Sequence, residues 1–212
     1  MSKYHKINGI YKREDGTGKF IKGDFSKEEF ALLQHIPWRW TEKIDGTNIR
    51  VNWCAETGKV TFKGRTDKAQ IPEHLFEYLR DKFDPYRFEK YETDITLYGE
   101  GMGHKIQSGG PKYFPHATKT VEFCLFDVRI GKWWLRKNDV VDIAEEFNIP
   151  NVGEYQPKTL RNMLNDFEDG RKLRSFFNPE IEPEGVIGIP ICELYDRAHE
   201  RVIVKLKYKD FK

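Results

Sequence analysis

Five short segments of this 212-residue chain combine lysines, carboxylates and an aromatic ring, the side chains that bind anions, cations and purine bases. In chain order they are 43–48 (KIDGTN), 99–101 (GEG), 126–127 (FD), 184–186 (EGV) and 205–207 (KLK). With 36 basic and 34 acidic residues the net charge is only +2, so anion binding has to come from locally clustered lysines and arginines. These five segments are therefore the candidates for a functional site.

Taken singly, each segment also has a purely structural interpretation. Asp45-Gly46 suits an ordinary hairpin turn, because glycine tolerates positive φ. The alternate glycines around Glu100 suit a loop with a solvated carboxylate, whereas a dinucleotide-binding turn is disfavoured because no helical pattern follows. Phe126 suits core packing as well as stacking on a purine. Alternation places Lys205, Lys207 and Lys209 on one strand face, which could simply be solvated.

The hydrophobic pattern predicts the elements that must position these segments. A capping box formed by Ser26 and Glu29 predicts a helix that Pro37 ends, and Pro72 opens a second helix. The segment 38–53 alternates around one interruption at Asp45-Gly46 and pairs as a hairpin with 59–63. Further strands are expected at 94–99, 120–128, 185–191 and 201–207, and further helices near 138–147 and 157–167. The fold class is therefore α+β with mostly antiparallel strands.

The composition is that of a polar chain able to bury a core. The mass is 25.1 kDa, 38% of residues are hydrophobic and 33% are charged, and the length suits one domain. We find no run of 18 apolar residues that would predict a membrane span, and no apolar segment typical of a signal peptide. Cys54, Cys124 and Cys192 lie far apart, so we expect reduced core thiols in a cytoplasmic protein rather than a zinc site.

Together and in this order, the five segments resemble the nucleotidyltransferase motifs of the covalent nucleotidyltransferase superfamily, which contains polynucleotide ligases and mRNA capping enzymes. The segment 41–48 (TEKIDGTN) is similar to the first motif of the RNA ligase 2 family of phage-type ATP-dependent RNA ligases, whose asparagine follows the lysine by five positions. The segment 62–66 (FKGRT) resembles the arginine segment of that family, and Lys205-Leu206-Lys207 followed by Phe211 resembles its last motif.

The resemblance implies an antiparallel-sheet-based nucleotidyltransferase fold (adenylyltransferase, ATP-grasp-like ligase) with flanking helices. It implies an ATP-dependent RNA ligase that joins 5′-phosphate and 3′-hydroxyl RNA ends through a lysyl-AMP intermediate and an adenylylated 5′ end. A lysine nucleophile must first lose its proton, and neighbouring cations or a metal ion lower its pKa from about 10.4. The implied cofactors are ATP, as the AMP donor, and Mg²⁺ or Mn²⁺; the implied partner is RNA.

The resemblance also assigns a role to each residue. Phe126 would stack on the purine, Glu100 would contact the ribose and Glu42 would contact the base edge. Asn48 would contact the α-phosphate or the nick terminus. The catalytic residues would be Lys43, Lys205 and Lys207; these three would also bind the nucleotide, together with Glu42, Asn48, Arg65, Glu100, Phe126 and Glu184. The metal would be held by Glu184 and Glu100, directly or through its waters.

The chain departs from the family at its end, because only five residues follow Lys207. We expect a single nucleotidyltransferase domain over residues 1–212 with no C-terminal OB or other appended domain. RNA binding should then be modest and salt-sensitive, or should need a separate RNA-binding protein. The alternatives are a minimal ATP-dependent DNA ligase, a GTP-using capping enzyme and a ligase-derived, non-catalytic RNA-binding module. The expected setting is RNA repair in a cytoplasm, that of the host if the source is a phage.

Overall fold

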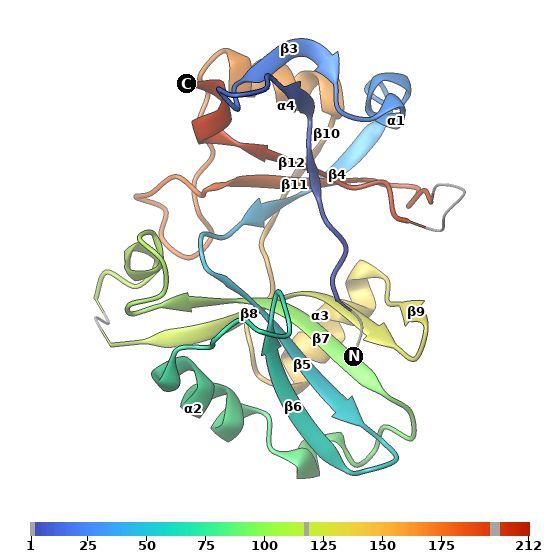
Figure 1. Cartoon of the computed structure of the whole chain (residues 1–212), viewed down its shortest axis with the longest axis vertical. Helices are drawn as coiled ribbons and strands as arrows, with labels where there is room; N and C mark the ends of the chain where they lie inside the picture. The colour runs from blue at the N-terminus through green and yellow to red at the C-terminus, as the bar shows by residue number, and fades with distance from the viewer. Residues whose placement is uncertain (1–2, 117–118, 196–199) are drawn as a thin grey trace. The chain divides into compact units, whose positions relative to one another are not determined.

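The structure, a computed structural model, describes residues 3–116, 119–195 and 200–212 (Figure 1). Contacts divide the chain into two compact units. Unit 1 contains the N-terminal residues through Tyr4 and residues 45–152, and unit 2 contains residues 5–44 and 153–212. The chain therefore passes between the units after Tyr4, Ile44 and Val152, and the KIDGTN segment is divided between them.

Unit 1 is built on a five-stranded antiparallel sheet with the order β6-β5-β7-β8-β9 (Figure 1). Its strands are β5 (Thr47–Cys54), β6 (Lys59–Gly64), β7 (Ile95–Gly103), β8 (Val121–Ile130) and β9 (Trp133–Trp134). Its helices are α2 (Glu73–Lys82) and α3 (Lys137–Glu146), with the short 3₁₀ helices η1 (Pro85–Phe88) and η2 (Gly110–Tyr113). The predicted hairpin is confirmed for β5 and β6, which pair from Ile49 opposite Gly64 to Cys54 opposite Lys59.

One face of this sheet forms the core of unit 1. Ile49, Val51 and Leu97 are fully buried there and share one hydrophobic cluster with the buried residues of α2 and α3. Successive side chains of a strand point to opposite faces. The polar neighbours of these core residues, among them Asn48 and Glu100, therefore lie on the face that the two helices leave free.

Unit 2 is built on a second five-stranded sheet, with the order β1-β12-β11-β4-β10. Its strands are β1 (Asn8–Gly9), β4 (Pro37–Lys43), β10 (Glu154–Thr159), β11 (Gly185–Pro190) and β12 (Val204–Lys207). The remaining elements are the β2 (Tyr11–Arg13) and β3 (Phe20–Phe25) hairpin, α1 (Glu28–Leu32), α4 (Leu160–Glu168) and the 3₁₀ helix η3 (Tyr208–Phe211). Every pairing in this sheet is antiparallel except that of β1 with β12, so the predicted α+β class with mostly antiparallel strands is confirmed.

The core of unit 2 lies between β4 and α4. Trp38 and Trp40 are fully buried and stacked, with ring centroids 6.0 Å apart. Phe167 of α4 stacks on Tyr208, immediately after Lys207, at 4.4 Å. The C-terminal residues are therefore packed into this core rather than trailing from it.

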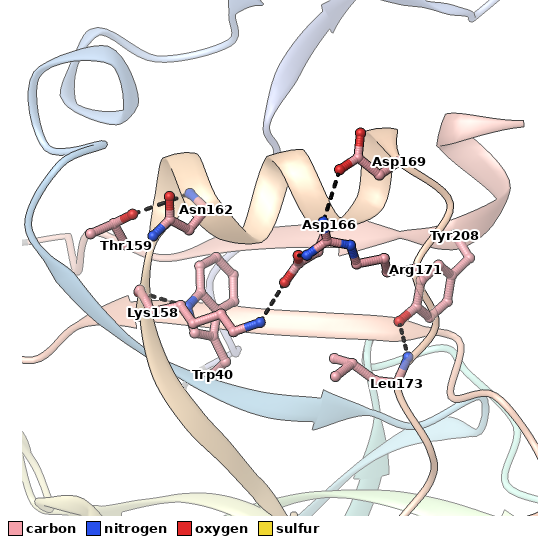
Figure 2. A network of polar contacts seen from close by, with 9 residues as sticks. All are labelled: Trp40, Lys158, Thr159, Asn162, Asp166, Asp169, Arg171, Leu173 and Tyr208. Atoms are coloured by element: carbon pink, nitrogen blue, oxygen red, sulfur yellow. Dashed lines mark hydrogen bonds and ion pairs between the residues drawn. The ribbon is translucent and has the colours of Figure 1, made fainter.

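A polar network fastens α4 to the sheet of unit 2 (Figure 2). The Asp166 carboxylate accepts hydrogen bonds from Lys158 Nζ at 2.5 Å and from Arg171 Nη1 at 2.7 Å. Thr159 caps the helix by accepting from the Asn162 N–H, and Trp40 Nε1 donates to the Lys158 carbonyl. Because Trp40 belongs to β4, these bonds fix the strand that ends in Lys43.

The sequence patterns predicted the three long helices correctly but not the start of the short helix α1. α2, α3 and α4 are confirmed, although α4 begins only at Leu160 because the preceding residues form the edge strand β10. The predicted capping box at Ser26 is wrong. Lys27 is the N-cap of the five-residue α1, and the Ser26 hydroxyl donates instead to the Gly9 carbonyl of β1 at 2.5 Å. Tertiary pairing with β1 thus replaces the local cap.

Three smaller expectations also need correction. β7 continues to Gly103, so the GEG glycines are strand residues; a Cβ at Gly101 would lie 2.5 Å from Leu75 Cδ2 of α2. Lys209 does not share the strand face of Lys205 and Lys207, because β12 ends at Lys207 and η3 begins. Of the three cysteines, only Cys124 is a core thiol; Cys54 is half-buried and Cys192 is exposed.

The helices found in the described ranges are too short or too polar to cross a bilayer.

Replacing Gly188 of β11 by alanine should destabilise the protein, because the new Cβ would lie 2.4 Å from the buried Trp40 ring. We expect Gly188→Ala to lower the free energy of unfolding by about 1–3 kcal/mol, the usual cost of overpacking a core. Gly9→Ala is the matched control, because its Cβ would lie 3.4 Å from the Phe20 ring, an ordinary contact. Urea denaturation measures both variants, and equal losses would contradict the prediction.

Candidate functional site

Lys43 and Lys207 flank Gly185 across three adjacent strands of unit 2. The register pairs Gly185 of β11 with Lys43 of β4 on one side and with Lys207 of β12 on the other. Residues that pair directly in a sheet project to the same face. A Cβ at Gly185 would lie 1.9 Å from the Leu206 carbonyl oxygen, so this row accepts only glycine in its middle. Both lysines therefore project from one face with no side chain between them.

Glu184 joins the two lysines. Its Oε2 accepts a hydrogen bond from Lys43 Nζ and its Oε1 accepts one from Lys207 Nζ, each at 2.5 Å. The backbone of Glu184 is held too, since its N–H donates to the Lys43 carbonyl and its carbonyl accepts from the Tyr208 N–H, both at 3.2 Å. A single carboxylate thus bridges ammonium groups that come from distant parts of the sequence.

The Glu184 carboxylate is ionised at neutral pH. Burial by itself would raise its pKa, but the charge of Lys43 and the hydrogen bonds from Lys207 and Lys43 together outweigh burial, so the pKa lies below its ordinary value of 4.5. Two ammonium groups around one carboxylate leave a net positive charge. Such a cluster is electrostatically suited to a phosphate.

A second row of residues extends the lysine face of this sheet. Ile187 of β11 pairs with Thr41 of β4 and with Lys205 of β12. These residues stand two positions from the first row, so they project to the same face as Lys43 and Lys207. Ile187 is half-buried and supplies an apolar surface there. The sequence reasoning missed Ile187, although alternation along 185–190 was a usable signal.

Glu42 faces the opposite side of β4 from Lys43. It is 2% exposed, and its Oε2 accepts a hydrogen bond from the Phe176 N–H at 2.9 Å. Burial raises the pKa of Glu42, and hydrogen bonds from Phe176 and Ser175 offset this only in part. The structure thus brings Lys43, Glu184 and Lys207 together, with Lys205 on the same face, while Glu42 anchors a loop. A contact of Glu42 with a base edge stays a prediction.

Asn48 and Glu100 are direct partners on the sheet face of unit 1 opposite its helices. They pair across β5 and β7, and Glu100 pairs in turn with Cys124 of β8. Among the described residues, no hydrogen-bond partner is found for the buried Oδ1 atom of Asn48. A buried polar atom of this kind calls for a partner supplied from outside the chain, such as a ligand or a water molecule. The pair is therefore a reasonable place for a polar ligand.

Phe126 is the extra residue of a β-bulge. Tyr98 of β7 pairs with Asp127 and Gly99 pairs with Leu125, which leaves Phe126 without an opposite residue. The bulge turns Phe126 and Asp127 to the same side, away from the core positions of Leu125 and Val128. Bulges re-aim side chains and are frequent beside active sites. The ring is half-buried rather than enclosed, unlike a pure core residue.

Tyr4 lies against Phe126 and was not anticipated from the sequence. The two rings meet edge to face with centroids 5.1 Å apart, and the Tyr4 hydroxyl donates to Asp127 Oδ2 at 2.9 Å. Asp127 is 3% exposed, so this bond lies in a largely buried environment. A single aromatic residue near the N-terminus carries no sequence signal of a contact more than 120 positions away.

Arg65 lies in the exposed loop that follows β6. The loop is held by Arg50 of β5, a fully buried arginine. Arg50 Nε donates to the Gly64 carbonyl at 3.0 Å, and Arg50 Nη2 donates to Asp67 Oδ1 at 2.9 Å. The predicted arginine is thus carried on a braced loop, and it belongs to unit 1 together with Asn48, Glu100 and Phe126.

The carboxylates fit a hard cation that arrives with its own phosphate ligands. No cluster of three or more metal-ligating side chains occurs within the ranges that the structure describes. Mg²⁺ commonly uses one or two carboxylates and completes its shell with water and substrate phosphates. Glu184 offers both oxygens, at present shared with ammonium groups, so a phosphate-bound Mg²⁺ or Mn²⁺ is compatible with this donor set.

Comparison with solved structures finds similar folds among RNA ligases. A lysine-to-methionine mutant of Naegleria gruberi RNA ligase with AMP and manganese superposes with a TM-score of 0.64 at 15% identity, over 84% of this chain and 52% of the other. A glutamate-to-alanine mutant of that ligase with AMP and manganese gives 0.67 at 14% identity, over 98% and 56%. The same ligase with pyrophosphate gives 0.64 at 16%, over 84% and 51%.

This chain thus spans a little over half the length of the ligases that it resembles. At such low identity, the likeness concerns the fold, and it agrees with the predicted α+β nucleotidyltransferase architecture. No match was found among curated proteins. The model of the RNA ligase family matches residues 36–207, which include all five segments that carry the candidate chemistry. The chain therefore belongs to the RNA ligase family.

Proposed function

We propose that this protein is an ATP-dependent RNA ligase that joins 5′-phosphate and 3′-hydroxyl RNA ends through a lysyl-AMP intermediate. The observation that carries the proposal is the cluster in which Glu184 bridges Lys43 and Lys207 on one sheet face. Family membership supports it, as do the AMP, ATP, manganese and pyrophosphate complexes of the structurally similar Naegleria gruberi ligase.

In the first step Lys43 Nζ attacks the α-phosphorus of ATP. An N–P bond forms, the bond from the α-phosphorus to the bridging oxygen breaks, and pyrophosphate leaves. The amine must be neutral to attack, and Glu184 Oε2, 2.5 Å from Nζ, is an acceptor within reach of its proton. Lys205 and Lys207 supply positive charge on the same face, where charge develops on phosphate oxygens.

Two further phosphoryl transfers complete the proposed reaction. The 5′-phosphate of one RNA end attacks the phosphorus of lysyl-AMP, which restores the Lys43 amine and leaves an adenylylated 5′ end. The 3′-hydroxyl of the other end then attacks the 5′-phosphorus and displaces AMP. Both steps gain chiefly from positioning and charge neutralisation, which the lysine face provides.

The residues of unit 1 contribute nucleotide contacts in this proposal. Phe126 stacks on adenine, in keeping with its bulged and half-buried position, and Glu100 contacts the ribose. Asn48 contacts the α-phosphate region or the RNA terminus through the N–H groups of its amide; its buried Oδ1 atom, for which the described residues supply no partner, would accept from a water molecule or a ligand hydroxyl. Arg65 neutralises phosphate charge from its braced loop.

Mg²⁺ or Mn²⁺ accompanies ATP in the proposal, with Glu184 as the first carboxylate and Glu100 as the second candidate, directly or through water. When bound, the cation would screen the triphosphate charge and polarise the phosphorus under attack. In the proposal the protein side chains bind the nucleotide, align Lys43 and accept the proton that the Lys43 amine loses.

RNA is the proposed substrate. We expect the protein to bind it with modest affinity, because the net charge is only +2. We expect one nucleotidyltransferase domain acting in cytoplasmic RNA repair, with a separate RNA-binding protein as a candidate partner. The competing functions are a minimal DNA ligase, a GTP-using capping enzyme and a non-catalytic RNA-binding module.

Incubation with labelled ATP and Mg²⁺ followed by denaturing electrophoresis should show a covalent adduct on the wild-type chain. Lys43→Ala and Lys43→Arg should both abolish it, the second although it keeps the charge beside Glu184. Lys59→Ala, which changes an exposed lysine at the start of β6, is the control and should label normally. Preferential labelling by GTP would favour the capping enzyme, and no adduct with either nucleotide would favour the binding module.

Nick sealing separates an RNA ligase from a DNA ligase. We expect the wild-type chain to seal a nick with a 2′-hydroxyl at its 3′ end at least about tenfold faster than an all-DNA nick, because a 2′-hydroxyl is the group by which proteins distinguish RNA from DNA. A gel assay of the sealed product on the two substrates measures this ratio. Equal or faster sealing of DNA would replace the proposal by the DNA ligase.

Glu184→Gln should destabilise the protein at neutral pH, because it leaves two neighbouring ammonium groups without their carboxylate. We expect a loss of about 1.5–3 kcal/mol in the free energy of unfolding, the range for hydrogen bonds to charged groups. The pKa of Glu184 is lowered on folding, so its contribution is complete above its ordinary value of 4.5 and disappears as pH falls through the lower folded value. Urea denaturation should show that the difference in unfolding free energy between the wild type and Glu184→Gln is constant down to about pH 5 and becomes smaller in stronger acid. A free-energy difference of the same size in strong acid would contradict the conclusion that the ionised Glu184 carboxylate stabilises the fold.

A further inference from the structure

The segment that begins at the last residue of β7 holds the Asp45-Gly46 turn, which follows Lys43 after one intervening residue. We call residues 103–113 the collar. Its last residue, Tyr113, is 3% exposed, and its hydroxyl oxygen accepts a hydrogen bond from the backbone N–H of Asp45 at 2.8 Å. Asp45 stands only two positions after Lys43. A buried side chain from a distant segment thus fixes the backbone next to the proposed nucleophile.

The Asp45-Gly46 turn is also packed tightly against neighbouring segments of unit 1. A Cβ at Gly109 of the collar would lie 2.1 Å from Asp45 Oδ2, so the carboxylate packs directly on that glycine. A Cβ at Gly46 would lie 2.4 Å from the Gly101 carbonyl oxygen and 2.7 Å from Glu100 Cγ. Asp45 and Gly46 are therefore both held by close contacts within unit 1, on top of the hydrogen bond to Tyr113.

The backbone of the collar is held in an unusual conformation by its surroundings. Lys105 and Gln107 adopt left-handed φ values of 54° and 51°, which non-glycine residues seldom take. Such conformations persist only where surrounding contacts enforce them. Two contacts do so here: the His104 N–H donates to the Thr120 carbonyl, and Ile106, 2% exposed, inserts into the core of unit 1.

The chain is held on both sides of Lys43, on each side within its own unit. On the N-terminal side, β4 holds Lys43 in register with Gly185. On the C-terminal side only Ile44, which is 3% exposed, separates it from the clamped turn. We propose that Tyr113 is a positioning residue for Lys43: by fixing the Asp45 amide it restricts the backbone from which the nucleophile projects. This inference rests on the proposed function of Lys43.

A positioning role predicts a specific kinetic signature. Tyr113→Phe removes one hydroxyl and keeps the ring, so the turn gains freedom while the nucleotide contacts stay as they are. The rate of lysyl-AMP formation at saturating ATP should fall about tenfold, since small misplacements of a reacting group cost much in rate. The KM for ATP should change less than about twofold, because the Tyr113 hydroxyl binds protein backbone and not the nucleotide.

The test combines single-turnover adenylylation with amide hydrogen exchange measured by NMR. Exchange at the Asp45 amide should speed up in Tyr113→Phe. Tyr91→Phe is the matched control: its hydroxyl donates to the Glu146 carboxylate elsewhere in unit 1, and neither the rate nor Asp45 exchange should change. Gly109→Ala, which presses a methyl group against the Asp45 carboxylate, is the second variant and should show the same fall in rate with little change in KM.

Four outcomes decide the matter. A slower rate with an unchanged KM and faster Asp45 exchange supports the inference. An unchanged rate in folded Tyr113→Phe and Gly109→Ala overturns it, even if both proteins melt at lower temperature. A raised KM with an unchanged rate also overturns it, since that would mean a nucleotide contact. If the wild-type chain forms no adduct, the proposed function itself fails and the positioning role falls with it, while the exchange data still report whether the hydrogen bond exists.

Discussion

The arrangement of the proposed active site depends on one carboxylate that bridges two ammonium groups. Lys43 and Lys207 project from the same sheet face on either side of Gly185, and without a counter-charge they would repel each other. Glu184 accepts a hydrogen bond from each lysine with one of its two oxygens, and its backbone is bonded to Lys43 of β4 and to Tyr208 of η3. The geometry therefore requires three strands in fixed register and a glycine at the centre, where any larger residue would meet the Leu206 carbonyl.

In both units one face of the sheet packs into the core and the other face carries candidate site residues. In unit 1 the helices α2 and α3 pack on one face with Ile49, Val51 and Leu97, and the opposite face carries Asn48 and Glu100. In unit 2 the core side of β4 carries Trp38 and Trp40, and the other side carries Lys43. In unit 2 alternation leaves every second residue of β4 and β12 partly exposed, whereas β7 of unit 1 is buried on both faces and only its Glu100 is partly exposed.

The sequence predictions that failed did so for identifiable tertiary reasons. Ser26 has the local signature of a helix cap, yet its hydroxyl bonds to β1, a contact that no local pattern encodes. Glu42 is a different case: its contact with a nucleotide stays a prediction, and the structure adds only that strand alternation turns it toward the core side, where the Phe176 N–H donates to its carboxylate. The strand expected at 94–99 continues in the structure to Gly103, because Gly99 and Gly101 leave room for the side chains of Phe123 and Leu75.

By itself, the sequence determined the α+β class, the β5–β6 hairpin, the helix α2 and the identity of the residues that the family match contains, since these follow from periodicity and motif order. Only the tertiary structure decided which of those residues meet. Four features join positions that are far apart in the chain: the pairing of Gly185 with both Lys43 and Lys207, the bulge at Phe126, the contact of Tyr4 with Phe126 and the hydrogen bond between Tyr113 and Asp45. Long-range register is set by the burial of whole sheet faces, a property of many residues at once that no short pattern contains.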